Sequence, residues 1–91
     1  MKDYRFDTKC VQGAYEPKNG EPRGMPIVQS TTYVYDSTDD VAAVFDDPTK
    51  SLIYSRFENP PTDCVEKKIA ALEGGVAAMC TSSGQAASFY A

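Results

Sequence analysis

The spacing of apolar residues changes twice in the second half of the chain, and each change predicts a new element. Val65, Ile69 and Leu72 recur at intervals of three or four residues, as on the buried face of a helix. Val76–Cys80 is instead an unbroken run of apolar or small residues, short enough for a strand buried on both faces. Residues 85–90 are again compatible with a helix. A helix, a buried strand and a second helix in this order indicate an α/β fold.

Turn-forming residues mark both ends of the first predicted helix. Thr62 or Asp63 is the expected N-cap, because Asp63 and Glu66 have the spacing of a capping box. Gly74 is the expected residue just past the helix end, since glycine adopts the left-handed conformation there without strain. The charged residues of the helix are expected to face solvent: Glu66, Lys67, Lys68 and Glu73.

The turn between the predicted strand and the last helix has the composition of an anion-binding site. Thr81–Gly84 carries three hydroxyl groups and ends in glycine, directly before the helix-compatible residues. The first amide N–H groups of a helix have no partners within it, and the helix dipole adds partial positive charge there. Gly84 has no Cβ, so a bound group could approach the backbone closely. The same residues could instead only turn the chain and cap the helix.

The first part of the chain predicts an arm that buries little of itself. A short helix is expected over Asp7–Gln12, with Asp7 or Thr8 as its N-cap. Residues 16–26 are rich in proline, glycine and asparagine, which is typical of turns and loops. Ile27–Tyr35 is rich in β-branched and aromatic residues and is expected to be extended.

A second short helix is predicted after this extended segment. Ser37 is its expected N-cap, and two aspartates follow in the first turn. Val41, Val44 and Phe45 fall on one face, and Pro48 marks the end.

Leu52–Phe57 is predicted to be a second extended segment. On a strand, Tyr54 and Arg56 point to the same side, because side chains alternate with a period of two. An arginine beside a phenol could bind a phosphate or carboxylate through its planar set of donors. The alternative is a surface arginine whose stem lies along an aromatic ring.

Composition excludes several classes of function. The 91 residues are 42% hydrophobic and 24% charged, as in ordinary globular chains. A net charge of −4 argues against a nucleic-acid interface. The first residues lack the apolar core of a signal peptide, and no apolar run has the length of a membrane span. The absence of histidine removes Ser–His and Cys–His catalysis and most metal sites from these residues.

The three cysteines favour a reducing compartment. Cys10, Cys64 and Cys80 are odd in number and widely spaced, which suits neither a disulfide framework nor a zinc site. A cytoplasmic location is therefore expected. The last helix would stop after fewer than two turns, too short to be stable alone, so we expect an N-terminal fragment of a longer protein.

Three motifs in this order resemble the Cys/Met-metabolism family of pyridoxal-phosphate (PLP) enzymes. They are Tyr54–Pro60, Leu72–Gly75 and Ser82–Ala87, with weaker similarity at 8–12, 26–27 and 30–33. Gln85 and the run 65–72 are most similar to the O-acetylhomoserine sulfhydrylases of the family. Two positions depart from the family pattern: Pro61, where Thr is usual, and Gln12, where several members have His.

The resemblance implies the N-terminal segment of a fold-type I, aspartate aminotransferase-like α/β transferase. Residues 1–50 would be an arm and short helix that contact another subunit, and residues 51–91 the start of the large PLP-binding domain. The turn would bind the cofactor phosphate through backbone amides, and Tyr54 and Arg56 would bind the same phosphate in the adjacent subunit. The implied cofactor-binding set is Tyr54, Arg56, Ser83, Gly84 and Gln85. The implied assembly is a homodimer that pairs into a homotetramer.

The implied reaction is γ-replacement on an activated homoserine, making homocysteine from O-acetylhomoserine and sulfide in methionine and cysteine biosynthesis. Cystathionine γ-synthase and methionine γ-lyase are the alternatives within the family. The Schiff-base lysine would lie beyond Ala91, so residues 1–91 hold no catalytic residue and alone are expected to be inactive. No metal, nucleic acid or membrane is implied.

Two alternatives belong to other classes. One is a non-catalytic interaction fragment that retains the N-terminal segment of an enzyme. The other is a serine hydrolase, with Cys80–Gly84 as its nucleophile elbow, although Cys80 stands at the position of the first glycine.

Overall fold

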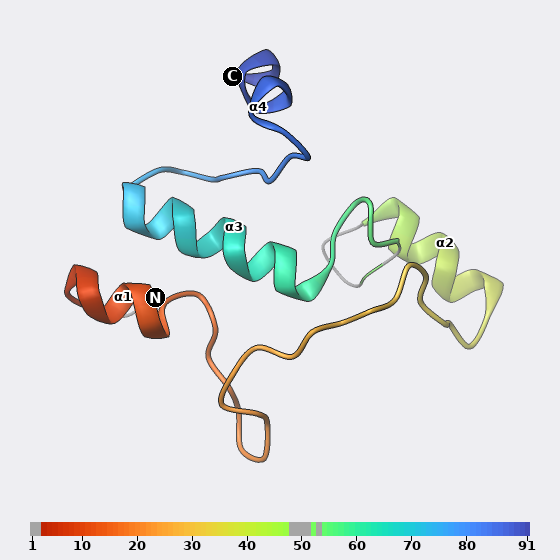
Figure 1. The fold of residues 1–91 in the computed structure, drawn as a ribbon. Coiled ribbons are helices and arrows are strands. Elements are labelled where there is room, and N and C mark those ends of the chain that lie inside the picture. The colour runs from red at the N-terminus through yellow and green to blue at the C-terminus, as the bar shows by residue number, and fades with distance from the viewer. Residues whose placement is uncertain (1–2, 48–51, 53) are drawn as a thin grey trace. The chain divides into compact units, whose positions relative to one another are not determined.

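The computed structural model describes residues 3–47, 52 and 54–91 and contains four helices over those residues (Figure 1). They are α1 (Phe6–Gln12), α2 (Thr38–Asp46), α3 (Pro60–Glu73) and α4 (Gly84–Tyr90). The chain forms two compact units. One joins the segment that ends at Met25 to Cys64–Ala91, and the other is Pro26–Asp63. Pro48, expected to end α2, and Ile53, in the second extended segment, lie outside the described residues.

In the first unit, α1 lies alongside α3 (Figure 1). The Nζ of Lys68 donates a hydrogen bond of 3.2 Å to the backbone oxygen of Cys10, near the C-terminal end of α1. A lysine is favourable there, because the last carbonyl groups of a helix have no internal partners and carry partial negative charge. Lys68 therefore does more than face solvent, which was its expected role.

The start of α1 differs from the expected one. The helix begins at Phe6 with Arg5 as N-cap, and no side chain caps it. Asp7, expected at or before the helix start, lies in the first turn. The prediction of Asp7 or Thr8 as N-cap was wrong by two or three residues, but an acidic residue still lies where the helix dipole favours it.

In the second unit, α2 confirms its predicted cap. The Oγ of Ser37 accepts a hydrogen bond of 3.1 Å from the amide of Asp40. Of the predicted apolar face, Val44 is 7% exposed, whereas Val41 is half-buried and Phe45 is exposed. Val44 is the single buried hydrophobic side chain among the described residues, so the core of this chain is small.

Helix α3 begins earlier than expected. The carbonyl of Asn59 accepts the first helical hydrogen bond, from the amide of Asp63 at 2.9 Å, so Thr62 and Asp63 lie inside the first turn and neither is the N-cap. Pro60 and Pro61 occupy the first two helical positions, where the missing N–H of proline is no loss because those amides have no helical partner. Pro61 is thereby compatible with a normal helix start, although a threonine is usual in the family it resembles.

The end of α3 is the predicted one. Gly74 has a φ of 68°, in the left-handed region. The amide of Gly75 donates to the carbonyl of Ala70 at 2.9 Å, which is the long hydrogen bond of a Schellman motif. The predicted glycine stop is confirmed.

The apolar stripe of α3 and the segment after it are not buried in these residues. Val65 is 50% and Ile69 46% exposed, so the predicted burial of this face is not found. Val76–Cys80 forms no strand, and Val76 is fully exposed. A strand is stable only when a neighbour completes its hydrogen-bond ladder. The described residues contain no such neighbouring strand, so the predicted strand over Val76–Cys80 does not form among them.

Candidate functional site

The residues expected to bind the cofactor lie in two separate groups. Tyr54 and Arg56 belong to the second unit, and Ser83, Gly84 and Gln85 belong to the first.

Tyr54 lies at the entry to a tight turn, not within a strand. It forms an isolated antiparallel bridge with Thr32, and the amide of Ser55 donates to the carbonyl of Thr31 at 2.8 Å. The amides of Phe57 and Glu58 then both donate to the Tyr54 carbonyl, at 3.0 and 3.1 Å. The predicted strand over Leu52–Phe57 is therefore wrong for its described residues after Tyr54. After Ser55, the described backbone hydrogen bonds of this segment are local ones within the turn.

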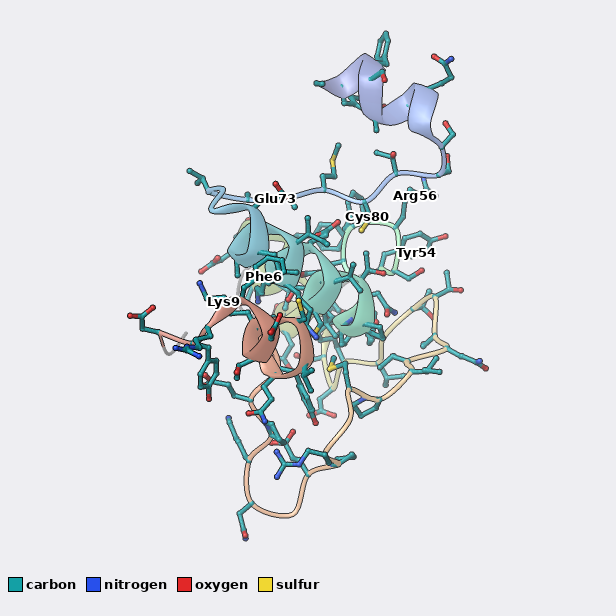
Figure 2. All side chains as sticks on the ribbon, turned by 60° about the vertical axis from the view of Figure 1, so that its left-hand side comes forward. Phe6, Lys9, Tyr54, Arg56, Glu73 and Cys80 are labelled. Atoms are coloured by element: carbon teal, nitrogen blue, oxygen red, sulfur yellow. The ribbon has the colours of Figure 1, made fainter. Side chains whose placement is uncertain are left out.

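The turn nevertheless brings the two predicted side chains together (Figure 2). The guanidinium carbon of Arg56 lies 5.2 Å from the centre of the Tyr54 ring, within the range of a cation–π contact. Phe57 is also against this tyrosine: the two ring centres are 6.3 Å apart at an angle of 66°, a T-shaped pair. One tyrosine ring thus contacts both a cation and a second aromatic ring.

A cavity of about 470 Å³ opens beside these three side chains. Two residues from the predicted apolar face of α2, Val41 and Phe45, line it. Tyr35 lines it as well, and its hydroxyl oxygen is buried without a hydrogen bond to any residue that the structure describes. The Arg56 guanidinium is a group that a polar ligand in this cavity could contact, whereas the Tyr35 hydroxyl oxygen is covered by protein atoms. The remaining lining residues are Thr32, Tyr33, Tyr54 and Phe57.

Asn59 anchors the extended segment at the start of α3, a role that the sequence pattern did not reveal. It is 8% exposed, and its Nδ2 donates to the Val28 carbonyl and to the Tyr33 hydroxyl, each at 3.2 Å. Both protons of the side-chain amide are used, as burial of such a group requires. The available signal was an asparagine directly before two prolines, which marked the end of the extended segment and the start of a helix and not a tertiary contact.

In the first unit, the turn before α4 leaves two helical amides open. Ser83 is the N-cap, and its Oγ accepts from the amide of Ala86 at 3.1 Å. Thr81 supports the turn, with its Oγ1 donating to the Ser83 carbonyl at 3.0 Å. Among the described residues, the amides of Gly84 and Gln85 donate to no group. Gly84 and Gln85 belong to the turn whose backbone amides the family resemblance implies as the phosphate site.

The space above Gly84 also fits an anion. A Cβ placed on Gly84 would meet no atom within 4 Å, and its φ is not in the left-handed region. The fold itself therefore does not require glycine there. An open, unsubstituted backbone with two unpaired amides is the arrangement that a phosphate group needs. The residues present fit the phosphate of PLP.

A carboxylate of α3 holds the segment that leads into this turn. The Oε1 of Glu66 accepts a hydrogen bond of 2.8 Å from the amide of Cys80. Glu66 was expected to face solvent only, and this contact corrects that expectation. It ties the residues just before Thr81 to the adjacent helix.

The family described as Cys/Met metabolism PLP-dependent enzyme matches residues 7–91. The chain belongs to this family. PLP is therefore the cofactor of the family to which these residues belong, as the motifs predicted. Family membership decides against the serine hydrolase alternative.

Similar proteins have consistent descriptions. An O-acetyl-L-homoserine sulfhydrylase of Leptospira meyeri is 42% identical over 99% of this chain and 21% of its own length. A homocysteine/cysteine synthase of Kluyveromyces lactis is 50% identical over 90% of this chain and 19% of its own length. The chain thus spans about a fifth of the length of these relatives.

A solved structure shares the fold of the chain. It is a candidate O-acetylhomoserine (thiol)-lyase of Campylobacter jejuni, with a TM-score of 0.81 and 34% identity over 97% of this chain and 22% of that one. That protein carries N′-pyridoxyl-lysine-5′-monophosphate at its position 205. The predicted α/β, fold-type I class is confirmed, although the strands expected of it are not formed within the described residues.

Proposed function

We propose that this chain is the N-terminal part of a PLP-dependent γ-replacement enzyme that makes homocysteine from O-acetylhomoserine and sulfide. The observation that carries the proposal is the pair of open amides at Gly84 and Gln85, in a family whose cofactor bears a phosphate. Relatives named for this substrate or this product support the choice of reaction.

The chain's own residues would hold the cofactor and not perform the bond changes. Ser83 shapes the turn, and the amides of Gly84 and Gln85 receive the phosphate at the helix start. Bound PLP supplies an electron sink for carbanion chemistry at the amino-acid substrate. The lysine that carries it is proposed to lie beyond Ala91, and residues 1–91 alone are proposed to be inactive.

The second half of the phosphate site is proposed to come from another subunit. Tyr54 and Arg56 would bind the phosphate held by the turn of the adjacent protomer, in a homodimer that pairs into a homotetramer. The Arg56 side chain is exposed and lies beside a cavity. It is therefore accessible to a phosphate bound by another subunit. The division into an arm at 1–50 and a cofactor-binding domain from 51 remains part of this proposal, as does a cytoplasmic location. In the part of the chain that the structure describes, no helix has the length and apolarity to cross a membrane.

The reaction can be tested with the full-length enzyme that contains these residues. Purified PLP-loaded enzyme is given O-acetylhomoserine with sulfide, O-succinylhomoserine with cysteine, or methionine alone. Homocysteine from the first pair at the highest kcat/KM is expected. A preference for cystathionine formation would identify a cystathionine γ-synthase, and breakdown of methionine a methionine γ-lyase. Either result would overturn the proposed reaction without touching the family assignment.

A further inference from the structure

We propose that Phe57 is a positioning residue for Arg56, acting through the ring of Tyr54. The inference rests on the proposed function, because it takes Arg56 to bind the cofactor phosphate. Phe57 stands in no phosphate-binding role of its own, and its side chain has no polar group with which to contact an anion.

The backbone of the turn fixes which side chains can meet. The Tyr54 carbonyl accepts from the amides of both Phe57 and Glu58, so residues 54 and 57 are one helical turn apart. Side chains three residues apart on such a turn lie on the same face. The T-shaped contact of the Tyr54 and Phe57 rings, with centres 6.3 Å apart, follows from this spacing.

The ring of Tyr54 then limits where Arg56 can go. An aromatic face attracts a cation, and the guanidinium carbon lies 5.2 Å from the ring centre. An arginine side chain has many rotamers, and each one that is excluded before binding reduces the entropy lost on binding. A tyrosine ring held by a neighbouring ring is a better-defined support than one that turns freely. Phe57 therefore positions Arg56 for its ligand indirectly, through the ring of Tyr54.

Phe57 packs little against the rest of the described residues. Its side chain is 75% exposed, and its ring contact is with Tyr54. Within the described unit its substitution should therefore cost little stability. In the full-length enzyme, where further residues can cover this side chain, the unfolding midpoint distinguishes an effect on folding from an effect on phosphate binding.

The test uses the full-length enzyme and its PLP-free form. Phe57→Leu and Phe57→Met remove the ring and keep an apolar side chain, whereas Phe57→Tyr keeps the ring. Phe6→Leu is the matched control, since Phe6 is also exposed, at 61%, and lies on α1 in the other unit (Figure 2). PLP is titrated into each apoenzyme, and the thermal unfolding midpoint of each apoenzyme is measured alongside.

We expect the two ring-free variants to bind PLP about two- to tenfold more weakly, the range for the entropy of ordering one rotamer-rich side chain on binding. Phe57→Tyr should restore most of the affinity, Phe6→Leu should leave it unchanged, and the affinities should not follow the small shifts of the unfolding midpoints that loss of a ring contact causes. In an Arg56→Ala background, Phe57→Leu should have no further effect on affinity, because its action passes through the arginine.

The outcomes separate this inference from the proposed function. If Arg56→Ala itself leaves PLP affinity unchanged, Arg56 does not bind the phosphate and the proposed function of this pair fails. If Arg56→Ala weakens binding but Phe57→Leu and Phe57→Met do not, only the positioning role fails. An equal loss from Phe57→Leu with and without Arg56 would also overturn it, since Phe57 would then act by another route.

Discussion

Replacing Gly84 by alanine should change the stability of the fold and the affinity for the cofactor in opposite directions. A Cβ at this position meets no atom within 4 Å, and the backbone is not left-handed, so the change creates neither a clash nor strain. Gly84 is the first residue of α4, where alanine is a better helix former than glycine by up to about 1 kcal/mol. The free energy of unfolding should therefore stay the same or rise slightly.

The cofactor affinity should respond in the opposite direction. A methyl group at position 84 would occupy open space where we expect the phosphate to approach the amides of Gly84 and Gln85, and it should weaken one of these two backbone contacts. Loss of one such contact to an anion costs on the order of 2 kcal/mol, or about 30-fold in affinity. Gly84→Val adds a branched side chain and should be more severe. Gln85→Met keeps the backbone amide and should hold affinity within about tenfold, or roughly 1.4 kcal/mol.

The assay is a titration of PLP into the full-length apoenzyme, followed by absorbance, with thermal unfolding of the same samples. The expected pattern is a stable Gly84→Ala protein that binds PLP weakly and a Gln85→Met protein that binds it nearly normally. Normal affinity in Gly84→Val together with a large loss in Gln85→Met would refute the reasoning. It would mean that side chains and not backbone amides bind the phosphate.

Three further predictions concern the rest of the chain. Arg56→Ala in the full-length enzyme should weaken PLP retention by roughly 1.5–3 kcal/mol, the range for hydrogen bonds to charged groups. Hybrid dimers of an Arg56→Ala subunit and a subunit that lacks the Schiff-base lysine should regain activity, because one of their two sites is intact. If no activity returns although the subunits exchange, Arg56 does not act across the subunit interface. Asn59→Ala removes two hydrogen bonds from a buried side chain. In chemical denaturation of the full-length enzyme it should lower the free energy of unfolding by about 1–3 kcal/mol. Asn19→Ala, at an exposed position, should leave that free energy unchanged. Equal effects of the two would contradict the anchoring role. Residues 1–91 alone should show no cooperative thermal transition and form no homocysteine, because Val44 is the one buried hydrophobic side chain in the described part; a sharp, concentration-independent transition would count against this.

Features that depend on a few neighbouring residues could be predicted from the sequence. The caps at Ser37 and the glycine stop at Gly74 are confirmed, because each is made by groups within about four residues along the chain. Ser83 likewise forms the helix start for which its turn was suited. The family motifs are equally local, and they sufficed to identify the family and its cofactor.

Features that depend on a partner far along the chain could not be predicted this way. Val76–Cys80 has the composition of a buried strand, but a strand also needs a neighbouring ladder, and the described residues supply none. Asn59 stands where the pattern places the start of a helix, yet its side-chain amide also donates to the Val28 carbonyl, 31 positions away in sequence. Tyr54 and Arg56 were expected together on a strand and are together on a turn. The sequence determined which side chains meet there, while the tertiary structure placed the turn, because the Ser55 amide donates to the Thr31 carbonyl and Tyr54 forms a bridge with Thr32.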